Sequence, residues 1–301
     1  MASERQIQLM ISVAPIGNRL DYCQRVLDGL RCLANACQVN TLANEEKWMI
    51  WPLKNPTSEM RIYTLSGLSL DDWYRYKLDM CSDCACIEVE IAFSAKKKKV
   101  ISFFARIYDL RPSDETTQEL EIRFSIPRSL WNEMDQNYFI KEFRKKCCSL
   151  NAIYAAVDQE WLCPTCVSDA PFMYFASSDC IKASYIPAIC WAQLLPLSRI
   201  KHAETMLAHS TPFCESIPIY NGSQNYIWLQ LRDDIWHPSI ETRIAFRKFL
   251  SPSFPTLDYS KLREHASLQF FQEEICWMPL LDDEKEKLQL DIHSTSQKII
   301  Q

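Results

Sequence analysis

The stretch Ile87-Glu88-Val89-Glu90-Ile91-Ala92-Phe93 decides the fold class, because apolar residues occupy every second position along it. This alternation places Ile87, Val89, Ile91 and Phe93 on one face, which is typical of a strand with one buried side. We therefore predict a β-strand here, and we predict that these four side chains point into one core.

Two further strand-like runs follow this one, Val100–Tyr108 and Leu120–Ile126. The basic run Lys96–Lys99 separates the first two strands, and we interpret it as a solvated hairpin connection rather than a phosphate-binding patch. Three successive strands of this kind favour an antiparallel meander over a parallel sheet.

Helical patterns follow the strands. Pro127 and Ser129 begin the clearest predicted helix. Its apolar stripe comprises Leu130, Trp131, Met134, Tyr138, Phe143, Cys147 and Leu150. Other predicted helices cover residues 20–37, 186–195, 197–208 and 239–250, together with a helical tail from residue 258. Asn221-Gly222 predicts a hairpin turn between strands at 217–220 and 226–231, because this dipeptide suits the positive φ angles of tight turns.

These elements predict an α+β fold with mixed or antiparallel sheets flanked by helices. Strands, helices and hairpins recur in both halves of the chain, which indicates two loosely similar lobes. We place an N-terminal α+β lobe at residues 1–115 and a C-terminal α+β lobe with a helical tail at 116–301. One continuous domain is the alternative.

Composition excludes several classes of function. The net charge of −5 argues against nucleic-acid binding, which requires a concentrated basic surface. No run approaches the roughly 18–20 apolar residues that span a bilayer, and the N-terminus lacks a signal-peptide core, so we expect a cytoplasmic protein without membrane contact. The chain has four isolated glycines, so the glycine-rich loops that bind nucleotides cannot be formed.

The chain has 14 cysteines, which we interpret mainly as small buried hydrophobic residues in a reducing compartment. Two Cys-x-x-Cys pairs, Cys81 with Cys84 and Cys163 with Cys166, have the spacing of zinc ligands. The 78 residues between the pairs (85–162) exceed the roughly 15–20 of a compact zinc module. We expect no cofactor, and a structural zinc ion at these four cysteines is the alternative.

No catalytic residue can be assigned from the sequence. None of the five histidines lies in a recognisable signature, and no G-x-S-x-G motif is present. The acid pairs, among them Asp71-Asp72, are typical of solvated turns and helix starts. An enzyme whose catalytic cysteine or carboxylates are assembled only by the fold remains an alternative.

The segment Asp233-Asp234-Ile235-Trp236 is the strongest candidate for a binding surface. It lies between a predicted strand and a predicted helix, where a loop can project from the core. Acids accelerate association with a basic protein, and an exposed tryptophan is a good anchor for it. We predict that Asp233, Asp234 and Trp236 contact a protein partner.

The second half resembles a family of bacterial immunity proteins linked to type VI secretion and polymorphic toxins. The resemblance covers roughly residues 120–255 and rests on the order of four pieces. These are the strand Ile122–Pro127 with its long helix and the small-residue strand Asn151–Val157, the segment Tyr185–Leu195, the hairpin ending in Trp228–Asp234, and the helix running into Phe249-Leu250-Ser251-Pro252.

The chain departs from the family pattern by lacking glycines after the long helix and after Leu195, and by containing the segment with Cys163 and Cys166. The resemblance implies stoichiometric binding of a toxin effector in the bacterial cytoplasm, without catalysis. A zinc-stabilised adaptor protein and the enzyme described above are the alternatives from other classes. The sequence does not indicate the oligomeric state.

Overall fold

The computed structural model describes residues 5–13, 32–33, 36–37, 43–52, 61–65, 84–94, 100–108, 120–159, 186, 189–200, 211–222, 224–254, 281–284 and 286. Up to residue 124, the strands other than the first are described by their backbone alone. The chain divides into two compact units, Met1–Glu160 and Trp161–Gln301. The sequence-based boundary between residues 115 and 116 falls inside the first unit.

The first unit contains three antiparallel strands in the order β6 (Leu120–Pro127), β1 (Gln6–Val13) and β7 (Ala152–Gln159). The central strand β1 places Leu9 opposite Phe124 on one side and opposite Val157 on the other. Residues 7–13 of β1 are all buried, so both faces of this strand are covered. Its sequence is correspondingly apolar at consecutive positions, as expected of a strand without a solvated face.

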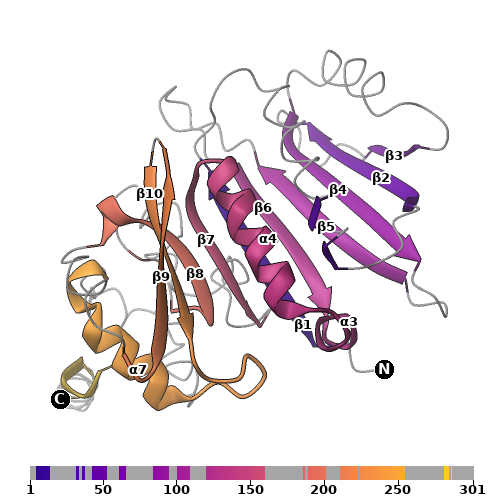
Figure 1. Cartoon of the computed structure of the whole chain (residues 1–301). Helices are drawn as coiled ribbons and strands as arrows, with labels where there is room; N and C mark the ends of the chain where they lie inside the picture. The colour runs from indigo at the N-terminus through magenta and orange to yellow at the C-terminus, as the bar shows by residue number, and fades with distance from the viewer. Residues whose placement is uncertain are drawn as a thin grey trace, which may run out of the picture. The chain divides into compact units, whose positions relative to one another are not determined.

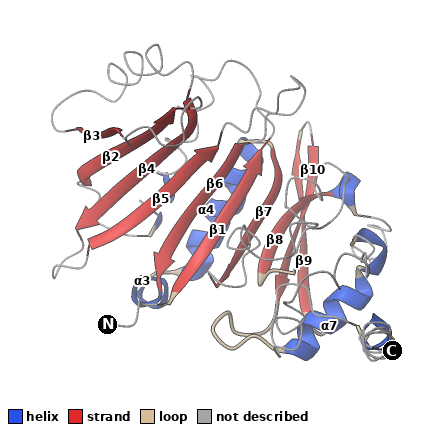
Figure 2. Ribbon diagram, turned by 180° about the vertical axis from the view of Figure 1, so that it is seen from behind, coloured by secondary structure: helices blue, strands red, loops and turns tan. Residues whose placement is uncertain are grey.

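A second antiparallel sheet in this unit has the order β3 (Arg61–Leu65), β2 (Ala43–Pro52), β4 (Cys84–Ser94) and β5 (Val100–Tyr108). The alternating stretch forms β4, as predicted, and β4 pairs with β5 so that Ile91 lies opposite Phe103. The predicted meander is thus confirmed for its first two strands, β4 and β5. β6, the third predicted strand, lies beside β5 in both views (Figures 1 and 2) but is hydrogen-bonded to β1. The β4 side chains and Lys96–Lys99 lie outside the described parts.

The long predicted helix is two helices, α3 (Arg128–Glu133) and α4 (Gln136–Ser149). Asp135 starts α4 because its side chain accepts a hydrogen bond from the Tyr138 backbone N–H at 3.0 Å, and such caps satisfy an otherwise unpaired donor. α4 crosses one face of the β6–β1–β7 sheet (Figures 1 and 2). Tyr138 is 47% exposed, so the prediction that it belongs to the apolar stripe is wrong.

The buried face of α4 is aromatic. Phe139 is edge-on to Trp131 with ring centroids 5.9 Å apart, and it stacks with Phe143 at 6.5 Å. All three rings are fully buried. After α4, Asn151 adopts a φ of 53°, which asparagine tolerates better than most residues, and the chain turns into β7.

The second unit contains the antiparallel strands β8 (Ala192–Pro196), β10 (Gln224–Leu231) and β9 (Cys214–Asn221), with β10 between the other two. The predicted hairpin is confirmed. Asn221 is the last residue of β9 and lies opposite Gln224, the first residue of β10, and Gly222 is in the turn between the two strands. Gly222 has a φ of +43°, a conformation that glycine adopts without steric strain.

The prediction of a helix over residues 186–195 is wrong for its last four residues, which belong to β8. All five β8 residues are buried, and Leu194 lies opposite Trp228 of β10. A short, mostly apolar run such as this one fits a buried strand or a buried helix equally well by its periodicity. The predicted second helix begins as a single 3-10 turn, Leu197–Arg199, and residues 201–208 lie outside the described parts.

The predicted helix after Ser239 is confirmed as α7 (Ile240–Phe249). Ser239 Oγ accepts a hydrogen bond from Thr242 N at 3.1 Å and so caps the helix. Along α7, Phe246, Arg243 and Arg247 are all buried. Two arginines thus lie on the core side of this helix.

Among the described residues, no helix is long and apolar enough to cross a membrane.

Candidate functional site

The predicted binding residues lie in the connection between β10 and α7, residues 232–239, which we name the β10–α7 junction. It is anchored where it leaves the sheet. Leu231 N donates to Trp191 O at 2.7 Å, and Arg232 N donates to Phe213 O at 3.0 Å. The junction therefore starts from a fixed backbone position.

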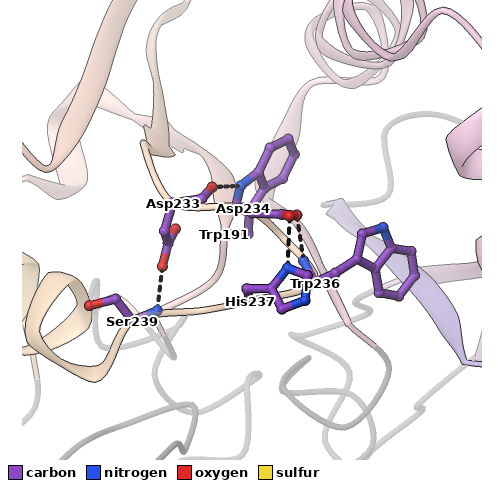
Figure 3. A network of polar contacts seen from close by, with 6 residues as sticks. All are labelled: Trp191, Asp233, Asp234, Trp236, His237 and Ser239. Atoms are coloured by element: carbon purple, nitrogen blue, oxygen red, sulfur yellow. Dashed lines mark hydrogen bonds and ion pairs between the residues drawn. The ribbon is translucent and has the colours of Figure 1, made fainter.

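Asp233 holds the two ends of the junction together (Figure 3). Its carboxylate oxygen Oδ2 accepts a hydrogen bond from Ser239 N at 2.8 Å, and its backbone oxygen accepts one from Trp191 Nε1 at 2.9 Å. The other carboxylate oxygen, Oδ1, is buried and has no hydrogen-bond partner among the described residues. Asp233 is thus mainly an internal residue of the junction.

Burial raises the pKa of the Asp233 carboxyl above its ordinary value of 3.8, although the Ser239 N–H and the positive charge of Arg243 oppose the rise. Arg243 is fully buried and donates from Nη1 to the backbone oxygen of Ile189. The ionised Asp233 carboxylate therefore attracts a buried guanidinium. Asp233 therefore has partners inside the protein, and its contact with a protein partner stays a prediction.

Asp234 points the other way and is half exposed, at 56% of its side chain. Oδ1 accepts a hydrogen bond from Trp236 N, and Oδ2 lies 2.9 Å from His237 Nδ1 (Figure 3). His237 N also donates to Asp234 O at 3.0 Å. Asp234 thereby closes a tight turn and holds an imidazole that is itself 76% exposed.

Trp236 is 7% exposed, so the expectation of an exposed aromatic anchor is wrong. Ile235, next to it, is 4% exposed. The turn closed by Asp234 carries both apolar side chains inward while the polar residues on either side stay at the surface. Whether Asp233, Asp234 and Trp236 contact a partner stays a prediction. The exposed residues of the junction are Arg232, Asp234 and His237.

His237 was missed because no motif surrounds it. One sequence signal points to its contact with Asp234. An aspartate side chain commonly accepts the backbone N–H two residues ahead of it, which is the Asx-turn found here at Trp236. That turn brings the residue three positions after the aspartate close to the same carboxylate. Asp234-x-x-His237 therefore fits a local pair.

The structure describes one of the four candidate zinc ligands, Cys84. Cys84 begins β4, where only the backbone is described, and Cys81, Cys163 and Cys166 lie outside the described residues. Within the described residues, no group of three or more histidine, cysteine or acidic side chains could hold a metal ion. The expectation that these cysteines bind no zinc stays a prediction.

Six described cysteines are thiols rather than halves of disulfides: Cys32, Cys37, Cys147, Cys148, Cys190 and Cys214. Burial raises the pKa of Cys37 and of Cys214 to about 12 and that of Cys148 to about 11. Burial also raises the pKa of Cys147 well above its ordinary value. Only the thiolate is a good nucleophile, so these four thiols are suited to packing rather than to attack on a substrate.

We expect Asp233→Asn to change how stability depends on pH. Between pH 3.8 and the raised folded-state pKa, the folded state binds more protons than the unfolded state. The stabilisation of the folded state by this extra proton binding at Asp233 is therefore complete below pH 3.8. It is lost as pH rises through the folded-state pKa. The Asn variant lacks this titration. Urea melts from pH 3.5 to 7 should show the wild type gaining stability relative to the variant as pH falls.

A matched control for this experiment is Glu133→Gln, which neutralises an exposed acid of α3. The stability difference between this control and the wild type should vary less with pH. If the difference in unfolding free energy between the wild type and Asp233→Asn stays constant across this pH range, the result would contradict the raised pKa of Asp233.

Comparisons with known proteins give a match of fold. No family model matches the chain, and no curated protein matches it. A solved structure of the Pseudomonas aeruginosa T6SS protein PA0821 matches with a TM-score of 0.51 at 11% sequence identity. The match covers 83% of this chain and 73% of that one. At this identity the similarity shows a shared fold.

Proposed function

We propose that this chain is a bacterial immunity protein, which neutralises a toxin effector by binding it stoichiometrically in the cytoplasm. The observation that carries the proposal is the fold similarity to the T6SS protein PA0821 over 83% of the chain. It supports the same type VI secretion context that the order of elements in residues 120–255 had implied.

The chemistry of the described residues supports a binding role over a catalytic one. The four thiols whose pKa is raised are held protonated by burial, so they are poor nucleophiles at neutral pH. The carboxylate with a raised pKa, Asp233, accepts a hydrogen bond from Ser239 N and is stabilised in its ionised form by the positive charge of Arg243. Each of these perturbed groups therefore has a structural explanation within the protein.

The β10–α7 junction supplies what a protein inhibitor needs. Its backbone is tied down by contacts to Trp191, Phe213 and Ser239, while Asp234 and His237 remain exposed. A loop that is already ordered loses little conformational entropy when a partner binds. A rigid polar loop of this kind suits the stoichiometric capture of another protein.

The proposal is tested by co-expression with the toxin-domain protein encoded by the neighbouring gene. We expect that protein to arrest the growth of a bacterial host and this chain to restore growth. The purified pair should elute as one complex whose mass, measured by light scattering, corresponds to one copy of each. Persistent growth arrest in the presence of soluble, folded chain would refute the immunity function, as would the absence of a toxin domain beside the gene.

A further inference from the structure

The imidazole of His237 is held in one orientation. Nδ1 lies 2.9 Å from Asp234 Oδ2, and the other oxygen of this carboxylate is engaged by Trp236 N at 2.9 Å. A carboxylate can only accept hydrogen bonds, so in the neutral imidazole Nδ1 carries the proton and Nε2 is left as an acceptor. Asp234 thus fixes both the ring orientation and its tautomer.

The contact between His237 and Asp234 contributes little to the stability of the fold. Both side chains are more than half exposed, at 76% for His237 and 56% for Asp234. Exposed ion pairs contribute roughly 0–1 kcal/mol. The larger consequence of the contact is that Nε2 is presented to solvent from a loop whose backbone is fixed by Asp233, Trp191 and Ser239.

The chemistry of the exposed atoms defines the partner. Nε2 of the neutral ring and the half-exposed Asp234 carboxylate both accept hydrogen bonds. The exposed charged residues between positions 232 and 241 are the acids Asp234 and Glu241 and the base Arg232, a net charge of −1 with histidine neutral. The chain as a whole carries −5. A side chain that donates hydrogen bonds and is positively charged fits this surface best.

We infer that His237, oriented by Asp234, is the recognition residue of the junction and accepts at Nε2 a hydrogen bond from a lysine or arginine of the toxin. The inference rests on the proposed function and replaces Trp236 with His237 as the contact residue. Trp236 supports the turn from inside the protein, and Asp234 is a positioning residue that acts through the imidazole.

Binding kinetics with the neighbour-encoded toxin test this inference. Hydrogen bonds to charged groups are strong enough that His237→Ala should raise the Kd about tenfold or more. Since His237 is exposed, the melting temperature of the His237→Ala variant should match that of the wild type. Asp234→Asn should also raise the Kd, because the imidazole loses the partner that fixes its orientation and tautomer. Two exposed controls, Tyr220→Ala on the β9–β10 hairpin and Glu133→Gln on α3, should change the Kd by less than about twofold.

A second measurement needs no partner. Long-range 1H–15N correlation spectra of the free protein at pH 8 should show the protonated Nδ1 tautomer for His237, and Asp234→Asn should shift the population towards the other tautomer. Finding the Nε2–H tautomer in the wild type would overturn the orientation by Asp234.

Unchanged affinity of His237→Ala, with wild-type binding intact, would overturn the recognition role while leaving the immunity function standing. A wild-type chain that does not bind the toxin would overturn both.

Discussion

Glu284→Ala is expected to lower the free energy of unfolding by about 3 kcal/mol, because it leaves a buried guanidinium without its counter-charge. Arg247 of α7 donates from Nη2 to Glu284 Oε1 at 2.7 Å and from Nη1 to Oε2. The two side chains are 4% and 12% exposed. Glu284 Oε2 also accepts from Leu281 N, so the same carboxylate stabilises the local turn. Denaturant melts of the purified chain measure the loss.

The neighbouring acid provides the control for this experiment. Glu286 is exposed in the same C-terminal segment, so Glu286→Ala should change stability by less than about 0.5 kcal/mol. Replacing both partners, as in Arg247→Met with Glu284→Met, should restore part of the stability that Glu284→Ala loses, since apolar pairs often replace buried ion pairs. Equal stabilities of Glu284→Ala and Glu286→Ala would show that Arg247 does not depend on this pair.

Trp236→Ala is expected to destabilise the protein by about 3 kcal/mol or more, the range found when a buried aromatic side chain is truncated. Trp236 is 7% exposed, whereas the sequence-based prediction made it an exposed anchor for a protein partner. The measurement is the free energy of unfolding from denaturant melts, made without any partner present.

Tyr220→Ala is the matched aromatic truncation, because Tyr220 is 72% exposed. It should lower the free energy of unfolding by less than about 0.5 kcal/mol. If Trp236→Ala unfolds at the same denaturant concentration as Tyr220→Ala, the indole is not part of the core. A weakened toxin affinity of Trp236→Ala is informative only when measured on the fraction that remains folded.

The elements that sequence reasoning predicted correctly have local causes. β4 follows from apolar residues at every second position, the β9–β10 hairpin from a glycine that takes a positive φ, and α7 from a serine cap before an amphipathic run. The predictions that failed lacked such a cause. Residues 192–195, Ala-Gln-Leu-Leu, are all buried in β8, and nothing in the periodicity of so short a run separates the observed strand from a helix.

The same division applies to the candidate site. The sequence by itself determined that two acids, a tryptophan and a histidine lie between a strand and a capped helix, since local patterns define both elements. Only the tertiary structure decided which of these residues face outward. Asp233 is drawn inward by Arg243, ten positions later, and by Trp191, 42 positions earlier. Contacts over such separations depend on how β8, β10 and α7 pack, and packing leaves no periodic signal in the sequence.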